Sequence, residues 1–354
     1  MQLIESGIIL LLTAVIVLFG CKICKLKKFN EDYLSLENTL PLRGTLSIFI
    51  VIYHISGHMK HTTLLNAFSQ IGYLIVAIFF FLSGYGLYYG YKNKNNYMKG
   101  FLLKRLPVVL IPYIIVTAFQ GVCLIFMGES IKISDFFASL LGYRMFDETT
   151  WYICMLTVLY IVFYLSFRFL SENKSTVVFI ILFLLVLTVF MVLPLEAKWT
   201  RSIIAFPLGV MWCKYKNKID NIIRNNYYIN LLLSGLAFLI TCFVKIAGVY
   251  LNSNLIVFLG NALSSITVCI LLSIILNKIT LKNKVLLWIG THSLEIYLYH
   301  NIILRILGRI QFIHNDTFLY VSTTFLITII ISMIISPINK LLIKACVKPK
   351  SQKA

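Results

Sequence analysis

Arg43 and His54 are the residues whose types and spacing most directly indicate chemistry. They lie eleven positions apart in an almost purely apolar stretch, LRGTLSIFIVIYHISGH, which runs from Leu42 to His58. On a helix this spacing places both side chains within about 20° of one face and separates them by ~16 Å along the axis. A guanidinium binds phosphate or carboxylate in a forked geometry, whereas an imidazole with a pKa of ~6.5 can take and return a proton near neutrality. The spacing therefore predicts an anion-binding group and a general base at two depths of one helix.

The composition places this helix in a membrane. The 354 residues have a mean hydropathy of +0.88, with 59% hydrophobic and only 13% charged residues, about half the charged share of a soluble domain. Several runs reach the ~18–20 apolar residues that cross a bilayer as a helix. Continuously apolar runs such as 177–193 exclude the alternating pattern of membrane strands. We therefore expect an all-α, polytopic helix bundle, in which an ionisable residue usually faces the bundle interior or a wet cavity.

The apolar runs predict about eleven transmembrane helices. The seventh contains Pro207 and Gly209, so we expect it to be broken or tilted where protein or water satisfies the freed backbone. Ser83 and Gly84 in FLSGYG predict a close helix crossing, because small residues let helices approach. The expected helices lie near residues 3–21, 40–57, 68–91, 106–127, 150–169, 176–194, 200–213, 227–247, 254–277, 286–311 and 317–340.

The basic residues predict the orientation of the bundle. Counted at alternating helix ends, one side carries 24 of the 32 Lys and Arg residues and the other carries eight. Because basic residues accumulate on the cytoplasmic side, we expect the N-terminus outside and the C-terminus in the cytoplasm. The net charge of +19 is spread over short loops, which suits contact with anionic membrane lipids rather than with nucleic acid. The expected location is the cell membrane, such as a bacterial inner or plasma membrane.

The cysteines predict no metal site and no bound cofactor. Six of the eight lie in or beside apolar runs, where cysteine behaves as a small hydrophobe. Cys21 and Cys24 form a single CxxC with no second pair and no histidine nearby.

Five further segments follow the Arg-x10-His helix in a characteristic order: FFFLSGYGLYYGYK, FLLKRLPVVLIPY, TTWYICMLTVLY, FPLGVMW and IGTHSLEIYLYHNIIL. Together they resemble the membrane acyltransferase-3 family, whose hallmark spacing Arg43 and His54 share. The resemblance covers about residues 39–345 and implies a ten-helix acyltransferase core. Residues 1–38 would then add one N-terminal transmembrane helix and a basic cytoplasmic loop, and residues 346–354 a basic cytoplasmic tail.

The resemblance also implies a reaction. Family members typically move an acyl group, often acetyl, from a cytoplasmic acyl-CoA to a hydroxyl of a carbohydrate or lipid-linked glycan at or beyond the outer face. We expect Arg43 and His54 to be catalytic, with His54 as general base or transient acyl carrier. We expect Arg43, Lys104 and Arg105 to contact the phosphates of acetyl-CoA or another acyl-CoA. Many members carry an Arg-x-x-Arg motif at the cytoplasmic start of the later helix that is expected here near residues 106–127. Here Arg105 fills the first arginine position and Val108 occupies the second.

A second group of residues is predicted to contact the acceptor. Glu148 and Trp151 would lie at the outer mouth, where acidic and aromatic side chains suit sugar hydroxyls and ring faces. Tyr297, His300 and Glu295 come from the tenth helix, and Glu295 and His300 lie 140° apart around it, so they need not share a cavity. Structural roles stay open: an interfacial belt for Trp151, a polar clamp between helices for Glu295, and packing for Tyr297 and His300.

Two other classes of function fit the same sequence. One is an exporter or flippase of polysaccharide or lipid-linked sugars, although such transporters usually show internal repeats with paired broken helices, and none is visible. The other is a membrane sensor or binding module within a biosynthetic complex, against which the absence of an attached soluble domain argues.

Overall fold

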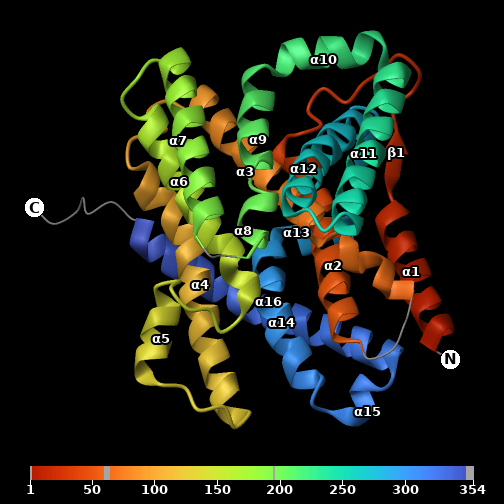
Figure 1. Cartoon of the computed structure of the whole chain (residues 1–354), viewed down its shortest axis with the longest axis vertical. Coiled ribbons are helices and arrows are strands. Elements are labelled where there is room, and N and C mark those ends of the chain that lie inside the picture. Colours follow the sequence, from red (N-terminus) through yellow and green to blue (C-terminus); the bar gives the residue numbers. More distant parts are fainter. Residues whose placement is uncertain (1, 60–63, 194–195, 348–354) are drawn as a thin grey trace, which may run out of the picture.

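The apolar runs fold into a helix bundle in the computed structural model, which describes residues 2–59, 64–193 and 196–347 (Figure 1). Within these ranges, eight helices are long and apolar enough to cross a membrane. They are α2 (Leu36–His58), α3 (Gly72–Asn93), α4 (Phe101–Phe126), α6 (Trp151–Phe167) with the η2 turn (Glu148–Thr150) before it, α7 (Glu172–Val192), α11 (Tyr227–Tyr250), α12 (Asn254–Leu276) and α16 (Thr317–Val347).

Three of the eleven expected helices are short or broken, so the count of eleven stays a prediction. The first, α1 (Gln2–Leu18), has 17 residues, and the seventh is divided into α8 (Lys198–Arg201) and α9 (Ala205–Lys214), as its proline and glycine indicated. The tenth was expected to be continuous and is instead divided at His292 into α13 (Lys284–Thr291) and α14 (Ser293–Leu307). There the side chains of Thr291 and His292 both contact the Trp288 carbonyl oxygen, at 2.7 and 2.9 Å, and compete with the helical hydrogen bonds.

Shorter elements connect these helices. The structure adds one small sheet to the expected all-α fold, in which β1 (Cys21–Ile23) pairs antiparallel with β2 (Ile279–Leu281), Cys21 opposite Leu281. Lys278 beside it donates to the carbonyl oxygens of Lys25 and Lys28, at 3.3 and 2.8 Å. The sheet thereby ties the loop after α1 to the loop after α12. The remaining elements are η1 (Leu64–Gln70), α5 (Ile133–Leu140), α10 (Lys216–Asn225) and α15 (Gln311–His314); of the expected tail, residues 348–354 lie outside the described ranges.

Two pairs of glycines set the closest helix crossings. Gly84 of α3 lies against the backbone of α9, and Gly209 of α9 lies against the backbone of α3. Gly44 of α2 and Gly290 of α13 form a second reciprocal pair, in which a Cβ on either residue would overlap a carbonyl group of the other helix. Small residues allow this approach, so the crossing expected at FLSGYG is confirmed. The second crossing fixes α13 against α2 at the residue that directly follows Arg43.

One end of the bundle is held by a network of buried polar groups. The Tyr33 hydroxyl donates to Asp220 Oδ1 at 2.7 Å and accepts from Trp212 Nε1 at 2.8 Å. Lys216 pairs with Asp220 at 2.6 Å. Burial, followed by the Asp220 carboxylate, raises the pKa of Tyr33, so this phenol stays a hydrogen-bond donor. The network fastens the segment before α2 to α10, which lies across this end (Figure 1).

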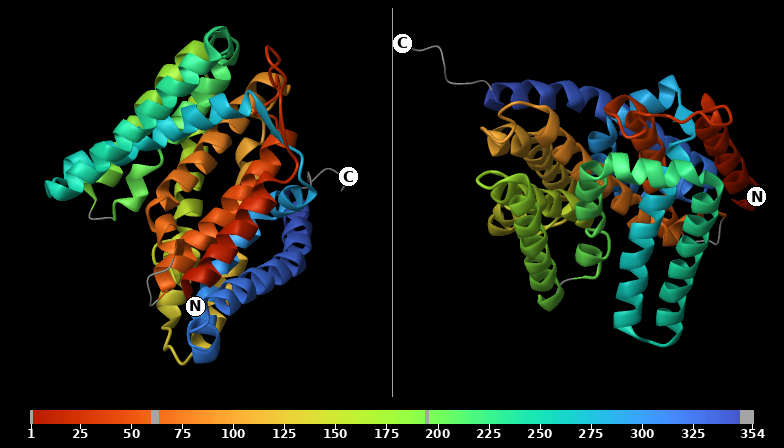
Figure 2. Two further views of the ribbon diagram at one scale, coloured as in Figure 1. Left: turned by 90° about the vertical axis from the view of Figure 1, so that its right-hand side faces the viewer. Right: turned by 90° about the horizontal axis from the view of Figure 1, so that it is seen from above.

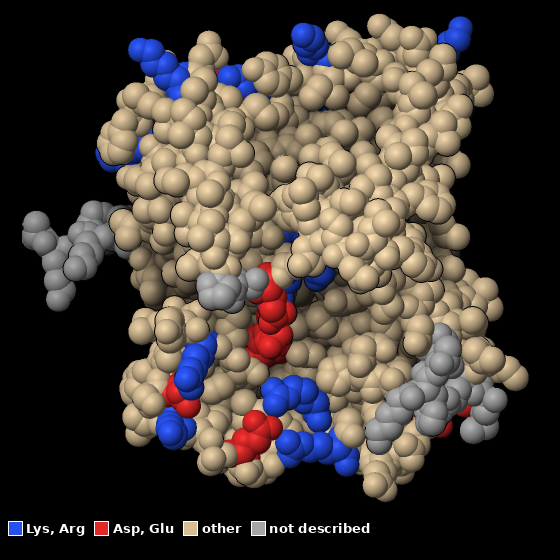
Figure 3. All heavy atoms as spheres, viewed as in Figure 1, with Lys and Arg blue, Asp and Glu red and all other residues tan. Residues whose placement is uncertain are grey.

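The surface is apolar around the middle of the bundle. On the face shown in Figure 3, Lys and Arg are scattered along the upper end, mixed acidic and basic side chains gather in the lower part, and a nearly uncharged zone separates them. Helices α11 and α12 form a hairpin that leans away from the other helices (Figure 2) and leaves most of its apolar side chains at least partly exposed. Such a zone is typical of a lipid-facing surface, and the chain is accordingly a multi-pass membrane protein.

Candidate active site

His54 of α2 and His300 of α14 contact each other inside the bundle. Their ring centroids are 4.9 Å apart and their planes are inclined by 47°. His300 is fully buried, and its Nδ1 lies 3.1 Å from the Ile296 carbonyl oxygen. Because a carbonyl oxygen only accepts, Nδ1 carries the hydrogen, and in the neutral ring Nε2 keeps the free lone pair. Within the described ranges this Nε2 is buried without a hydrogen-bond partner.

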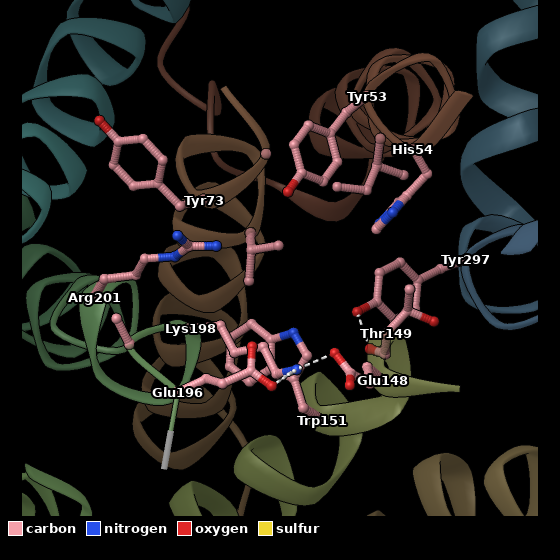
Figure 4. A pocket seen from close by; sticks show the side chains of 14 residues that line it. Tyr53, His54, Tyr73, Glu148, Thr149, Trp151, Glu196, Lys198, Arg201 and Tyr297 are labelled. Atoms are coloured by element: carbon pink, nitrogen blue, oxygen red, sulfur yellow. Dashed lines mark hydrogen bonds and ion pairs between the residues drawn. The ribbon is translucent and has the colours of Figure 1, made fainter. Parts of the chain in front are cut away.

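A cavity of about 430 Å³ opens beside His54 (Figure 4). Its walls come from α2, α3, η2 and α6, the segment around α8, and α14, so segments far apart in the sequence meet here. His54 points toward Tyr297 across one side of the cavity in Figure 4. The labelled lining residues are Tyr53, His54, Tyr73, Glu148, Thr149, Trp151, Glu196, Lys198, Arg201 and Tyr297.

Tyrosines line the path from this cavity toward Arg43. The Tyr297 hydroxyl donates to the Thr149 carbonyl oxygen, and its ring lies 6.0 Å from the His300 ring and 5.5 Å from the Tyr152 ring. The Tyr152 hydroxyl in turn lies within electrostatic range of Arg43. The two candidate catalytic residues of α2 are therefore connected through aromatic side chains of α6 and α14.

Arg43 and Arg105 both lie near the Tyr160 hydroxyl, at the end of this series of aromatic residues away from the cavity. Both guanidinium groups lie within electrostatic range of the Tyr160 hydroxyl on α6. Arg43 Nε is buried, with no hydrogen-bond partner in the described ranges. Arg105 donates to the Tyr97 hydroxyl at 2.7 Å, and burial raises the pKa of Tyr97 despite this cation. The structure thus brings two of the three predicted donor contacts together, while Lys104 is exposed on the surface of α4.

Asp147, which directly precedes Glu148, is a buried acid beside the histidines. Its carboxylate accepts from the Thr149 amide and from Asn301 Nδ2, both at 2.8 Å, and from Gln120 Nε2 at 3.4 Å. It also lies within electrostatic range of His300. Asn301 directly follows His300, so a single turn of α14 carries both the buried imidazole and a hydrogen-bond donor to the Asp147 carboxylate.

The predicted acceptor contacts separate into two groups. Glu148, Trp151 and Tyr297 line the cavity, and His300 lies outside the lining but against His54. Glu295 is buried elsewhere, and its Oε1 accepts from Asn339 Nδ2 of α16 at 3.1 Å. This contact matches the polar clamp between helices that the sequence left open for Glu295. Glu295 and His300 do not meet because they lie 140° apart around the helix.

Several lining residues had no signal in the sequence that tied them to a site. Tyr53 and Tyr73 are two of 20 tyrosines, most of which the composition gives no reason to single out. Lys198 and Arg201 lie at the start of the broken seventh helix, where the sequence gave no sign that they face a cavity. Lys198 in fact bridges Glu148 and Glu196 at 2.8 and 3.0 Å inside the cavity wall.

A fully buried histidine in contact with a half-buried one, beside a cavity with charged lining residues in a bundle of apolar helices, is typical of a membrane protein with a reaction or binding site among its helices. The family model described as an acyltransferase domain matches residues 42–337. The chain therefore belongs to the acyltransferase-3 family, and an acyltransferase activity follows from that membership. No curated protein and no solved structure matches the chain significantly.

Proposed function

We propose that this protein is an O-acyltransferase that moves an acyl group, with acetyl as the expected one, from a cytoplasmic acyl-CoA to a hydroxyl of an extracytoplasmic or lipid-linked carbohydrate. The observation that carries the proposal is the contact between His54 and His300 at the wall of a polar cavity. A neutral imidazole facing such a cavity can accept a proton from a hydroxyl, which is the step that acyl transfer to a sugar requires.

His54 acts as the general base in this proposal. The acceptor hydroxyl attacks the thioester carbonyl while His54 takes its proton, and the CoA thiolate leaves and receives that proton as the thiol. His300 keeps the His54 ring in place, and its free Nε2 lone pair makes it an acceptor beside the imidazolium that forms. A transient acyl group on His54 is the alternative route through the same residue.

Arg43 and Arg105 bind the phosphates of the donor. Arginine forms forked, charge-assisted hydrogen bonds with phosphate, and the unpartnered Arg43 Nε leaves such bonds available. Lys104 adds a cation at the exposed edge, where Val108 stands in place of a second arginine. If the basic end is cytoplasmic, the donor approaches from Arg43 and the acceptor from the cavity that Glu148, Trp151 and Tyr297 line.

The test uses the purified full chain in lipid nanodiscs with radiolabelled acetyl-CoA and the surface glycans of the producing cells. We expect label in the glycan with the wild-type protein, and a loss of ~10²–10⁴-fold for His54→Ala. His292→Gln is the matched control, because His292 stacks on Trp288 outside the cavity. Full transfer by His54→Ala would refute the role of His54. Unmodified glycan retained inside deletion cells, with no transfer in vitro, would instead support an exporter.

A further inference from the structure

Two cations face the ring of Tyr73, which lines the cavity on the side away from His54. Arg201 also lines the cavity, whereas Lys245 lies beyond its lining. Arg201 Cζ lies 5.7 Å from the Tyr73 ring centroid, and Lys245 Nζ lies 4.5 Å from it. The three residues come from α8, α11 and α3, and Arg201 extends beside Tyr73 into the cavity in Figure 4. The two cations also lie within electrostatic range of each other, so the arrangement brings like charges together.

Neither cation has an acidic partner within ion-pair distance in the described ranges. The two carboxylates that line the cavity both bind Lys198. Within the described residues, the hydrogen-bond acceptor of Lys245 Nζ is the neutral Gln70 Oε1, at 3.2 Å. Arg201 Nε is buried with no hydrogen-bond partner in the part of the chain that the structure describes. Arg201 and Lys245 are both partly buried. A partly buried cation without an acidic partner is unfavourable, and a second cation beside it increases that cost, so an anion bound between the two would lower it.

The surrounding hydrogen bonds hold the Tyr73 ring and the segment that carries Arg201 in place. The Tyr73 hydroxyl is within 2.9 Å of Ser264 Oγ, which fixes the direction of the ring. Ser265 Oγ donates to the Arg201 carbonyl oxygen at 3.2 Å, and Ser202 Oγ donates to the Tyr73 carbonyl oxygen at 2.9 Å. The segment that carries Arg201 is thereby anchored to α12 and α3. A preorganised cationic group of this kind binds an anion with little further ordering.

We propose that Arg201 and Lys245 form an anion-binding subsite that takes a carboxylate or phosphate group of the acceptor. The acceptor is therefore an acidic glycan, held by its charge while the hydroxyl to be acylated reaches His54. This inference rests on the proposed function, since it names the acceptor class of the same cavity. Cation–π contacts with Tyr73 stabilise each cation, but they leave two neighbouring positive charges without an acidic partner in the described ranges, which favours an anionic ligand.

The experiment compares acyl transfer to the acidic glycan fraction of the producing cells with transfer to the same fraction after carboxyl reduction and dephosphorylation. With wild-type protein in phosphatidylcholine nanodiscs, we expect KM to rise by ~10-fold or more when the glycan is neutralised, which corresponds to about 1.4 kcal/mol of lost binding. Arg201→Gln and Lys245→Met should raise KM for the acidic glycan to that of the neutral one, with kcat changed less than about twofold. Arg309→Gln is the matched control, because Arg309 pairs with Glu129 outside the cavity.

The outcomes separate this inference from the function on which it rests. Transfer by wild-type protein that ignores the charge of the glycan overturns the subsite and leaves the acyltransferase intact. A charge effect that arises only when phosphatidylglycerol is added to the nanodiscs assigns the anion to a lipid headgroup and also overturns it. Absence of transfer to any glycan, with both fractions and both lipids, refutes the proposed function itself.

Discussion

His54 and His300 lie in contact, 4.9 Å apart between ring centroids, although 246 positions separate them in the chain. One helix therefore supplies a histidine that faces the cavity, and another supplies a fully buried histidine whose Nδ1 hydrogen is already committed to a backbone carbonyl. This relationship makes His300 the residue whose substitution best separates packing from chemistry.

We expect both His300→Phe and His300→Asn to lower kcat for acyl transfer by at least ~10-fold while KM for acyl-CoA stays within about twofold. Phenylalanine preserves the ring contact with His54 but removes both nitrogens, so steady-state kinetics of this variant decides the question. Wild-type kcat for His300→Phe would assign His300 to packing alone.

Arg43→Gln should raise KM for acyl-CoA by ~10-fold or more, because it removes a charge-assisted bond to phosphate. KM for the acceptor should not change, since Arg43 lies outside the cavity lining. The measurement is a two-substrate kinetic matrix on protein in nanodiscs. Arg168→Gln is the control, as Arg168 lies exposed beyond α6 and contacts Phe169. Equal donor KM values for both variants would contradict a role of Arg43 in donor binding.

Asp147→Asn should reduce kcat by ~10-fold or more. The substitution preserves the size of the side chain but removes the negative charge near His300. The asparagine Oδ1 can still accept from Thr149 and Asn301, whereas its Nδ2 then stands against the Gln120 Nε2 donor. A buried donor left without an acceptor costs about 1–3 kcal/mol. Asp135→Asn serves for comparison, because that acid pairs with Arg144 in a largely exposed position. Indistinguishable rates for the two variants would show that the charge of Asp147 has no part in the reaction.

Gly84→Ala should destabilise the protein by about 1–3 kcal/mol, because the added Cβ overlaps the Phe206 carbonyl group where α3 crosses α9. Gly86→Ala, two residues later on the same helix, adds a Cβ that meets nothing within 4 Å, and should be neutral or slightly stabilising. Thermal unfolding in detergent measures both. A Gly84→Ala variant as stable as Gly86→Ala would contradict the close crossing.

The free energy of unfolding should fall at alkaline pH because of Tyr33, which belongs to the buried network with Asp220 near α10. The pKa of Tyr33 in the folded protein is raised, so its contribution is fully present below the unfolded value of ~10 and is lost as pH rises further. Tyr33→Phe removes the bond to Asp220 and should cost about 1–2 kcal/mol near neutrality. Melting temperatures between pH 7 and 11 should converge for the two proteins at the alkaline end. A constant difference over this range would exclude the titration.

The broken helices illustrate where local sequence predicts an interruption and where it does not. Pro207 and Gly209 predicted a broken or tilted seventh helix, and the break directly precedes α9: Pro207 lies in the first turn of α9, where a missing backbone donor is tolerated. The break at His292 was not predicted, although Gly290 stands two residues before it, because it depends on side chains that contact the Trp288 carbonyl and on the crossing with α2 at Gly290. Tertiary packing overrides local propensity at such a position.

The sequence by itself determined that this chain is a membrane helix bundle, that Arg43 and His54 share one helical face, and that its motifs resemble the acyltransferase-3 family. These features depend on composition and on the fixed geometry of a helix. Only the tertiary structure decided that His300 contacts His54 and that Glu295 instead binds Asn339. It also decided that Arg201 and Lys245 both lie against the Tyr73 ring. Helical periodicity places a side chain on its own helix, whereas the helix that it meets is set by glycine crossings and broken segments distant in the chain.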